Sequence, residues 1–477
     1  MPANTAELIQ RLQSILGCDA VLSSPSQLLV YECDGFTMEK NKPDVVVFPT
    51  STEQVVQVVQ VCNQLDVPFL PRGAGTSLAG GCLPVGGGVV LSLARMKRIL
   101  EVDYRNRFAV VEPGVINLWL TNHLKPQGYY FAPDPSSQGA CTIGGNVATN
   151  SGGPHTLKYG VTVNHVLGLQ FVLPDGRVVQ TGGPVEDNPG YDLTGVMVGS
   201  EGTFGIATKV WVRISRSPEA YRTLLGVFET VDDATNTISD LIGAGIVPAA
   251  LEMLDRLILQ AVEEAFHFGF PLDAGAVLIM EVDGLEAGLD ADAERITAIA
   301  KANHAREVRR ANTEAERQLL WKSRKQAFGA VGRLAPSYCT QDGVVPRTKL
   351  PAILRTIQAI GTKYDLRICN VFHAGDGNIH PILLFDERDA DQVRRVLAAS
   401  HEILEECVRV GGSVTGEHGI GVEKIDFMPL LFTPDDFSMM MRLRSAFNPD
   451  GRCSPRKMLP TAGACIEPSK AGRRAAL

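Results

Sequence analysis

Two short motifs in the C-terminal half concentrate residues that could bind a metal or move a proton. HAGDGNIH places His373 and His380 seven residues apart around a turn at 375–377, and GEHGIG places Glu417 beside His418. A strand–turn–strand in the first motif would bring both histidines to one side of a sheet, and Glu417 could complete a His₂-carboxylate set for a divalent metal. Either motif alone is typical of histidines satisfied within a core or turn. Together they favour a metal or catalytic site.

Arg324 could bind the carboxylate of a substrate. It lies in LWKSRKQAF, inside a segment with a strong helical pattern. A guanidinium stays charged and can grip a carboxylate with two parallel hydrogen bonds. Most helix arginines are solvated, so the pattern itself leaves both alternatives open. Arg72 is a second candidate, but its position beside a glycine-rich loop suggests that it serves that loop.

Glycine accounts for 47 of the 477 residues, and much of the excess lies in three clusters rich in hydroxyl and amide side chains. They are PRGAGTSLAGG (71–81), PDPSSQGACTIGGNVATNSGG (133–153) and GSEGTFGIAT (199–208). The first cluster is not a Rossmann turn, because Leu78 stands where the third glycine is required and no helix follows. Its consecutive backbone N–H groups would suit a pyrophosphate. A loop without a ligand is the alternative for any one cluster, but three clusters in one region favour a flat ring system with phosphates.

The elements that position these residues fall into two regions. From 44 to about 215, short strands alternate with turns and helices, including a helix over 52–66 and a hairpin over 165–182 with Asp175-Gly176 at its turn. From 221 to about 411, longer helical patterns, clearest at 312–335 and 388–410, separate fewer strands. Residues 1–17 predict a short amphipathic helix. The overall class is α+β, with a sheet covered by helices in the second region.

Composition excludes several classes of protein. The net charge is 45 − 53 = −8 with no basic stripe, which argues against a nucleic-acid binder. Hydrophobic residues make up 45% and charged residues 21%, values typical of a globular domain. No pair of the ten cysteines has CxxC spacing, so zinc ribbons and iron–sulfur clusters lack ligands, and reduced thiols are expected. No signal peptide or apolar run long enough for a membrane span is evident, so we expect an intracellular, cytoplasmic protein.

The three glycine clusters together resemble the FAD-binding domain of the vanillyl-alcohol oxidase/PCMH flavoprotein superfamily. HAGDGNIH and GEHG narrow the resemblance to its glycolate oxidase GlcD-type and FAD-linked D-lactate dehydrogenase branch. The resemblance covers about 34–460 and implies a two-lobed PCMH-type FAD-binding domain at 1–218, an α+β cap domain for the substrate at 219–425, a segment at 426–462 returning to the FAD-binding domain, and a flexible tail at 463–477. His155 follows the second cluster, but this branch is expected to hold FAD non-covalently.

The same resemblance implies a set of cofactor-binding residues. In the first cluster, Gly73–Ser77 would hold the pyrophosphate; the second would run past the isoalloxazine and ribityl chain; Glu201–Ile206 would touch the adenine half; and Asn448 would close the flavin site. The implied residues are Pro71, Arg72, Gly73, Ala74, Gly75, Thr76, Ser77, Pro133, Asp134, Ser136, Thr142, Gly144, Gly145, Asn146, Asn150, Gly152, Glu201, Gly202, Ile206 and Asn448.

The resemblance also implies a reaction. His373, His380 and Glu417 would bind a divalent metal, usually zinc but with manganese or iron as alternatives; His418 would be the general base; and Arg324 would bind the substrate carboxylate. A small D-2-hydroxy acid, glycolate or D-lactate, would be oxidised to the 2-keto acid by hydride transfer to FAD. Relatives acting on larger dicarboxylic substrates often carry asparagine where this chain has Ile382, which argues against hydroxyglutarate.

The resemblance further implies partners for reoxidation of the flavin. Without cluster-binding cysteines, electrons are expected to pass to an iron–sulfur subunit, a second flavin-binding subunit, a quinone or an electron-transfer flavoprotein. Such a partner could hold the chain at the inner face of the membrane. Two alternatives remain: a non-catalytic FAD-binding subunit, disfavoured by the retained HAGDGNIH and GEHG motifs, and a metal-dependent hydrolase, which would leave three glycine clusters without a task.

Overall fold

The computed structural model describes residues 5–185 and 189–460. These residues form two compact units: the first contains 5–152, 160–217 and 417–460, and the second contains 153–159 and 218–416. The second unit ends at Gly416, where the sequence-based expectation for the cap domain is 425, and it includes the short segment 153–159 that begins at the last residue of the second glycine cluster. The expected tail at 463–477 lies outside the described residues.

Short buried strands build the first sheet of the first unit. Its order is β1-β2-β4-β3, with β2, β4 and β3 parallel. These elements are β1 (Val21–Leu22), β2 (Val45–Val47), β3 (Phe69–Arg72) and β4 (Val89–Ser92). Helices α1 (Thr5–Leu16) and α3 (Thr52–Gln64) pack in the same hydrophobic core, and α2 (Pro25–Leu28) precedes a short 3₁₀ turn. Strand β2 is Val-Val-Val and buried throughout, as expected for a parallel strand covered on both faces. The predicted amphipathic N-terminal helix is present.

An antiparallel sheet forms the second lobe of this unit, in the order β5-β6-β10-β8-β9. Its strands are β5 (Ile99–Asp103), β6 (Phe108–Val111), β8 (Val166–Val172), β9 (Val178–Gly182) and β10 (Ile206–Arg213). The predicted hairpin is β8–β9, and Gly176 in its turn has φ 89°, a value that favours glycine. Around the sheet lie α4 (Asn117–Leu124), α5 (Ile143–Thr149), α7 (Leu193–Met197) and the small pair β7 (Tyr129–Tyr130) and β11 (Ser215–Arg216).

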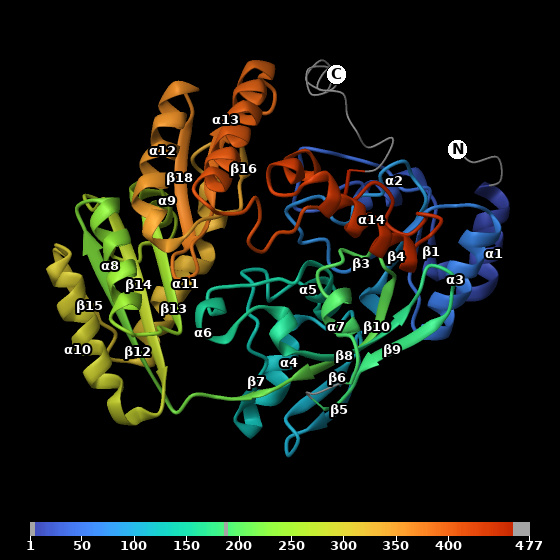
Figure 1. Cartoon of the computed structure of the whole chain (residues 1–477), viewed down its shortest axis with the longest axis horizontal. Helices are drawn as coiled ribbons and strands as arrows, with labels where there is room; N and C mark the ends of the chain where they lie inside the picture. Colours follow the sequence, from blue (N-terminus) through green and yellow to red (C-terminus); the bar gives the residue numbers. More distant parts are fainter. Residues whose placement is uncertain (1–4, 186–188, 461–477) are drawn as a thin grey trace. The chain divides into compact units, whose positions relative to one another are not determined.

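The C-terminal segment returns to the first unit. Helix α14 (Pro434–Phe447) begins at a capping box on Thr433. Beyond this helix, the backbone N–H of Phe69 donates to Arg452 and the N–H of Ser454 donates to Phe69, so the chain extends the first sheet beside β3. This pairing explains why residues so distant in sequence share one unit (Figure 1).

The second unit is a long antiparallel sheet between two layers of helices. The sheet order is β15-β12-β14-β13-β18-β19-β17, and β20 joins β18 to β16. Its strands are β12 (Ala220–Phe228), β13 (Ala250–Asp255), β14 (Ala276–Gly284), β15 (Glu307–Arg310), β16 (Ser337–Thr340), β17 (Gly343–Val344), β18 (Arg367–His373), β19 (Asn378–Ile379) and β20 (Pro381–Phe385). Its helices are α6 (Thr156–Tyr159), α8 (Val231–Gly243), α9 (Arg256–Phe266), α10 (Glu286–Ala302), α11 (Glu314–Val331), α12 (Leu350–Lys363) and α13 (Ala390–Arg409).

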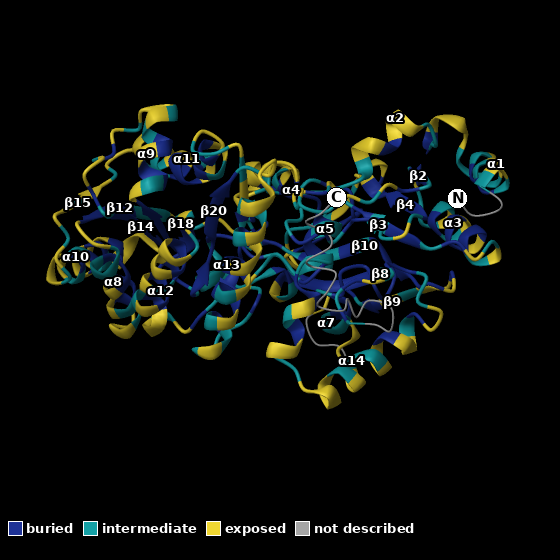
Figure 2. Cartoon of the chain, turned by 90° about the horizontal axis from the view of Figure 1, so that it is seen from above, coloured by how far each residue is buried: buried dark blue, intermediate teal, exposed yellow. Residues whose placement is uncertain are grey.

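Helices α9 and α11 cover one face of this sheet, and α8, α10, α12 and α13 cover the other, with buried strands between them (Figure 2). The two helices expected from sequence at 312–335 and 388–410 are α11 and α13. Their starts are fixed by side-chain caps: Thr313 accepts from the Glu316 N–H, and Asp389 accepts from two N–H groups. The helices and strands of both units agree with the expected α+β class.

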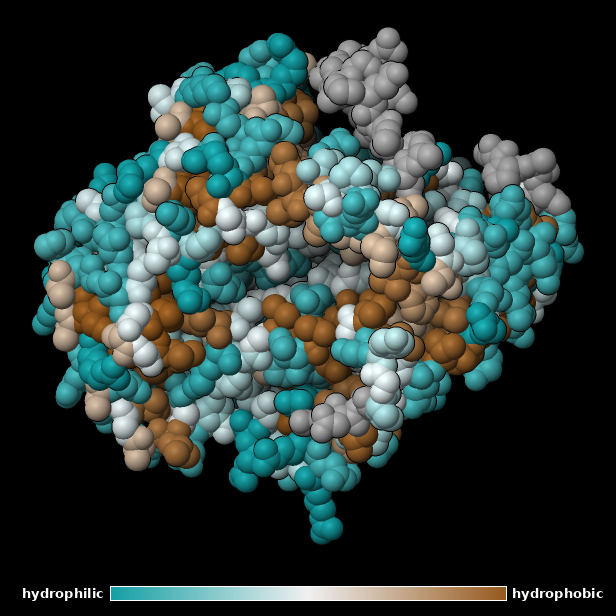
Figure 3. All heavy atoms as spheres, in the orientation of Figure 1, coloured by the Kyte–Doolittle hydropathy of each residue, from teal (hydrophilic) through white to brown (hydrophobic). Residues whose placement is uncertain are grey.

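Surface and thiol chemistry add little to the site. On the face drawn in Figure 3, apolar residues form patches between hydrophilic ones, and the large exposed apolar side chains include Val30, Tyr191 and Met439. In the part of the chain that the structure describes, every cysteine is free. No helix among the described residues has the length and hydrophobicity needed to cross a membrane.

Candidate active site

Glu252, on β13, lies at the centre of the polar cluster in the second unit. Its side chain is completely buried, and Oε1 lies 2.7 Å from Nδ1 of His373 while Oε2 accepts from Nε of Arg324 at 2.5 Å. Register explains the first contact, because Glu252 and His373 are opposite each other on the antiparallel strands β13 and β18. Arg324 reaches the same carboxylate from α11. One buried carboxylate therefore holds both a predicted metal ligand and the predicted substrate-binding arginine.

Arg324 is buried, with an exposed fraction of 1%, so the solvent-exposed alternative for this residue is wrong. Its Nη2 is buried and has no hydrogen-bond partner among the described residues. A buried guanidinium N–H without a partner is costly, because each lost hydrogen bond leaves an uncompensated desolvation penalty of roughly 1–3 kcal/mol. The guanidinium therefore offers a donor that an incoming carboxylate could satisfy.

His373 and His380 come together as the motif predicts. Strand β18 ends at His373, the turn follows, and His373 pairs with Asn378 at the start of β19. The two rings are 5.4 Å apart between centroids, and a ligand nitrogen of each lies within 4.8 Å of the other. Gly377 has φ 80°, and a Cβ at this position would lie 2.1 Å from the Val345 carbonyl oxygen, so the turn requires glycine.

A second buried carboxylate, Asp342, stands beside His380. Its Oδ1 lies 3.4 Å from Nε2 of His380, and its Oδ2 accepts from the Thr415 hydroxyl at 2.6 Å and from the Gly416 N–H at 3.0 Å. Gly416 is itself required, because a Cβ there would lie 2.5 Å from the Asn378 amide carbon. Asp342 therefore ties the chain immediately before Glu417 to the histidine pair.

The donor set fits a divalent metal. Two buried imidazoles lie close together, and each has a carboxylate beside it, the usual arrangement around metal-binding histidines. Because Nδ1 of His373 lies against Glu252, Nε2 is the ring nitrogen that would serve as the metal ligand. Glu417 belongs to the first unit, and it directly follows Gly416, the last residue of the second unit's main segment.

Charge and burial act in opposite directions on the Glu252 carboxyl. Burial raises its pKa, while Arg324 and His373 lower it, and the net pKa lies below the ordinary value. The ion pair with Arg324 therefore favours the ionised form of Glu252, whose two oxygens can both accept hydrogen bonds.

The predicted FAD-binding residues all belong to the first unit, where the three glycine clusters converge. A Cβ on Gly73 would lie 2.4 Å from Oγ1 of Thr142, and a Cβ on Gly202 would lie 2.8 Å from the Pro71 ring, so the first cluster closely contacts the other two. The N–H groups of Gly199 and Glu201 donate to Val147 and Ala148 at 2.8 Å, which joins the third cluster to the second. Close backbone packing thus accounts for much of the glycine content.

The first cluster supplies a row of unused donors. Among the described residues, the backbone N–H groups of Ala74–Leu78 make no hydrogen bond to other backbone groups. Gly75 has φ 74°, and a Cβ there would meet the Arg72 guanidinium, whose Nη1 donates to Cys33 and which lies over the Tyr31 ring. The Arg72 side chain therefore packs against the backbone of the first glycine cluster at Gly75. Consecutive free N–H groups suit a diphosphate, so the residues present fit the pyrophosphate of FAD.

The other predicted cofactor residues occupy varied positions. Pro133, Asp134 and Ser136 lie in the loop before α5, with the Pro133 carbonyl accepting from Asn117. Thr142 caps the start of α5, which contains Gly144, Gly145 and Asn146. Asn150 is the C-cap residue of this helix, and Gly152 follows in the next loop. Gly144 has a packing reason, since its Cβ would lie 2.5 Å from Cβ of Pro113. Ile206 starts β10 and is completely buried in the core, so its side chain supports the strand.

Glu201 has a role that the sequence did not suggest. Its buried carboxylate accepts from the N–H groups of Ile420 and Gly421, both at 2.7 Å, and so holds the GEHGIG loop. Gly421, at φ 53°, also has no room for a Cβ, which would lie 1.9 Å from the Ala79 carbonyl oxygen. The loop that carries Glu417 and His418 is therefore fixed to the first and third glycine clusters.

Two residues from the C-terminal segment fasten the same region. Asn448 donates from its amide to Thr203 and Cys453, at 3.0 and 2.8 Å, so it holds the final turn against the third cluster. Lys457 is completely buried and donates to the carbonyls of Gly80 and Gly81. Burial lowers the Lys457 pKa to about 8, against the smaller opposing effect of nearby acidic groups.

The His155 side chain contacts an aromatic ring and a buried carboxylate of the second unit. Its ring stacks on Trp321 with 5.2 Å between centroids, and Nε2 lies 3.7 Å from Oε1 of the buried Glu281. Burial raises the pKa of Glu281, but His155, Arg317 and Thr223 lower it to about 2 overall. His155 thus has structural partners in the second unit, Trp321 and Glu281.

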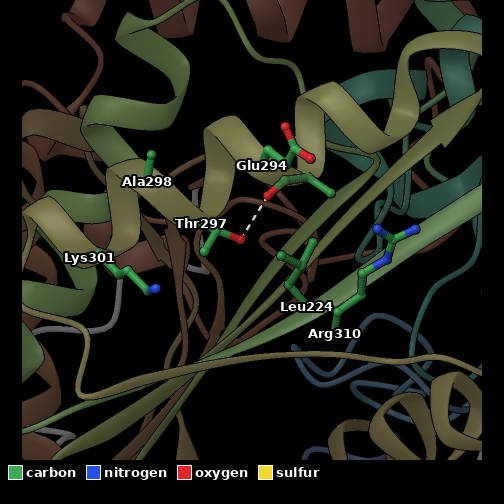
Figure 4. A pocket seen from close by; sticks show the side chains of 7 residues that line it. Leu224, Glu294, Thr297, Ala298, Lys301 and Arg310 are labelled. Carbon is green, nitrogen blue, oxygen red and sulfur yellow. Dashed lines mark hydrogen bonds between the residues drawn. The ribbon is translucent and has the colours of Figure 1, made fainter.

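The pocket in Figure 4 is not the candidate site. It lies between α10 and strands β12 and β15, and its lining residues are Leu224, Ala293, Glu294, Thr297, Ala298, Lys301 and Arg310. None of these is a predicted site residue, and Arg310 is paired with Asp290. Ile382 also lies away from any open surface: it is completely buried in the hydrophobic core beneath α9 and α11.

Comparison with known proteins identifies the family. Residues 43–182 match a family described as FAD binding domain, and residues 217–458 match one described as FAD linked oxidases, C-terminal domain. The chain belongs to the FAD linked oxidases. It is accordingly an FAD-dependent oxidoreductase, as the sequence motifs predicted.

The sequences of known relatives align with this chain over almost its whole length. The chain is 45% identical to glycolate oxidase subunit GlcD of Escherichia coli K12, covering 94% of this chain and 90% of the relative. It is 40% identical to the protein of the same name in Bacillus subtilis, covering 95% and 97%, and 30% identical to D-lactate dehydrogenase of Anaerostipes hadrus, covering 95% and 97%.

Solved structures support the fold. p-Cresol methylhydroxylase with substrate bound has a TM-score of 0.80 at 18% identity, covering 94% of this chain and 96% of that one. 4-Ethylphenol oxidase from Gulosibacter chungangensis has a TM-score of 0.77 at 20% identity, covering 96% and 97%.

Sequence reasoning missed Glu252 and Asp342. A signal was present for Glu252, because AALEMLD places a carboxylate inside an apolar strand, where a charge must be paired. Asp342, in TQDGVV, carries no comparable signal.

Proposed function

We propose that this FAD-dependent oxidoreductase oxidises a small D-2-hydroxy acid, glycolate or D-lactate, to the corresponding 2-keto acid. The observation that carries the substrate class is the buried guanidinium of Arg324, which has an unpartnered Nη2 and is held by Glu252 beside the histidine pair. A fixed, permanently charged fork is suited to a carboxylate. The names of the relatives, glycolate oxidase subunit and D-lactate dehydrogenase, support the same class.

Two side chains of this chain have separate roles in the proposed reaction. Arg324 binds the substrate carboxylate and so fixes the position of the neighbouring carbon. His418 accepts the proton of the 2-hydroxyl as general base. FAD, held by the residues of the three glycine clusters, would supply the oxidising power by accepting a hydride equivalent from Cα of the substrate. The loss of one proton and one hydride converts the hydroxy acid to the keto acid. The buried surroundings of Arg324 exclude water from its ion pair with the substrate carboxylate.

We propose that His373, His380 and Glu417 hold a divalent metal, zinc in the first instance and manganese or iron as alternatives. The proximity of the two buried histidines and the attachment of Gly416 to Asp342 support this set. A bound metal would lower the pKa of the 2-hydroxyl as a Lewis acid.

Electron transfer from the reduced flavin requires an acceptor. We propose a cytoplasmic chain that passes electrons to an iron–sulfur or second flavin-binding subunit, a quinone or an electron-transfer flavoprotein, with membrane attachment only through such a partner. The word subunit in the names of two relatives supports an assembly.

Anaerobic mixing of the purified protein with a panel of D- and L-2-hydroxy acids, followed at the flavin absorbance, tests the proposal. Rapid bleaching by glycolate or D-lactate, with little effect of the L-enantiomer, is expected. Bleaching by D-2-hydroxyglutarate alone would favour the alternative substrate, and no bleaching by any member would favour a non-catalytic FAD-binding subunit.

A further inference from the structure

The two oxygens of Glu252 make two different hydrogen bonds, and the chemistry of the partners fixes their direction. Arg324 can only donate, so Oε2 accepts from its Nε. Oε1 of an ionised carboxylate can also only accept, so Nδ1 of His373 must carry the proton. In the neutral ring, Nε2 of His373 is then the unprotonated nitrogen, whose lone pair could bind a metal or accept a proton.

We propose that Glu252 is a positioning residue that sets the tautomer of His373 and the orientation of Arg324 together. This inference rests on the proposed function, because it assigns how the metal-ligand histidine and the carboxylate-binding arginine are prepared for substrate. Both are fixed through a single side chain that is itself completely buried. A change at Glu252 therefore alters both halves of the site.

The neighbouring strand provides a matched comparison. Glu281 on β14 is also completely buried and binds a second arginine of the same helix, Arg317, through two hydrogen bonds of 2.8 Å. Its other short hydrogen bonds come from the Trp321 indole N–H and the Thr223 hydroxyl, neither of which is a predicted metal ligand. Glu281 therefore attaches α11 to the sheet as Glu252 does, without touching His373.

Replacement of Glu252 by glutamine reverses one hydrogen bond while preserving shape. The amide oxygen must face Arg324, because the amide NH₂ cannot accept from a guanidinium. The NH₂ then faces His373, whose Nδ1 must become the acceptor and whose proton must move to Nε2. The ring keeps its place but loses the nitrogen that could bind a metal.

Nitrogen-15 NMR of histidine-labelled holoenzyme, treated with a chelator to remove metal and still loaded with FAD, measures this directly, because protonated and unprotonated ring nitrogens resonate at distinct shifts. The His373 signals are assigned by their loss in His373→Asn. Wild type and Glu281→Gln should show the proton on Nδ1, and Glu252→Gln should show it on Nε2. An unchanged His373 tautomer in Glu252→Gln would overturn the inference, and this readout does not depend on turnover or on metal.

Zinc titration of chelator-treated holoenzyme gives a second measurement. Glu252→Gln should bind zinc 10- to 100-fold more weakly than wild type, the usual effect of losing a carboxylate behind a metal-binding histidine. Glu281→Gln should lose thermal stability yet bind zinc as wild type does, and FAD content should be equal in all three. Equal zinc affinity in wild type and Glu252→Gln would refute the inference. Failure of wild type itself to bind zinc would refute the proposed metal site, while the tautomer measurement would still decide the role of Glu252.

Discussion

Replacement of Arg324 by lysine is expected to damage substrate binding and turnover without loss of flavin. In the structure, Arg324 uses Nε for Glu252 and keeps a buried, unpartnered Nη2. A lysine ammonium can retain the ion pair with Glu252, but it is a point charge and cannot present a second N–H in the same plane. The variant should therefore fold and yet lack the donor intended for the substrate carboxylate.

The size of the effect follows from that single donor. A hydrogen bond to a charged group contributes about 1.5–3 kcal/mol. At 1.36 kcal/mol for each factor of ten, kcat/KM should fall about 10- to 150-fold. Misplacement of the reacting carbon should reduce kcat as well as raise KM, because the arginine also orients the substrate.

Stopped-flow reduction of the flavin over a range of D-lactate or glycolate concentrations separates binding from the chemical step. Arg317→Lys is the matched control, since Arg317 binds a buried glutamate from the same helix but has no proposed contact with substrate. It should lose some stability and keep its kinetic constants. A value of kcat/KM for Arg324→Lys within threefold of wild type would refute the assignment of Arg324 as the carboxylate ligand.

Three further outcomes are expected. A chelator should abolish turnover while the protein stays folded and yellow, and added zinc or manganese should restore turnover. His380→Ala should lower the metal content, whereas His418→Ala should keep the metal and slow flavin reduction about 10²–10⁴-fold. A fully active metal-free enzyme would contradict the metal assignment. Denaturation without proteolysis should release FAD into solution, and flavin that remains with the precipitated chain would disprove a non-covalent cofactor. Burial lowers the Lys457 pKa from 10.5 to about 8, so between these pH values the unfolded chain binds more protons than the folded chain. The free energy of unfolding should therefore rise with pH across this window, by roughly 3 kcal/mol relative to Lys457→Met. If the free energies of unfolding of the two proteins, measured by urea denaturation, change with pH in the same way, the buried amine does not titrate as stated.

The sequence by itself determined the features that depend on near neighbours. Helices α11 and α13 follow from side-chain periodicity and caps, and the β8–β9 hairpin follows from its Asp-Gly turn. The pairing of His373 with His380 was also predictable, because a glycine turn between two strands brings residues seven apart to the same place. These features need only local hydrogen bonds and backbone preferences, which act over a few residues.

The tertiary structure alone decided the partners of the site residues. Glu252 contacts Arg324 and His373 across 72 and 121 residues of sequence, and Glu201 contacts Ile420 across 219. Such contacts depend on strand order and on the return of the C-terminal segment, which are set by burial of the whole chain and not by any local pattern. The same holds for Gly144, whose neighbour Pro113 is apparent only in the fold. A motif could name the reactive groups, but only the packed sheet could supply the buried carboxylates that orient them.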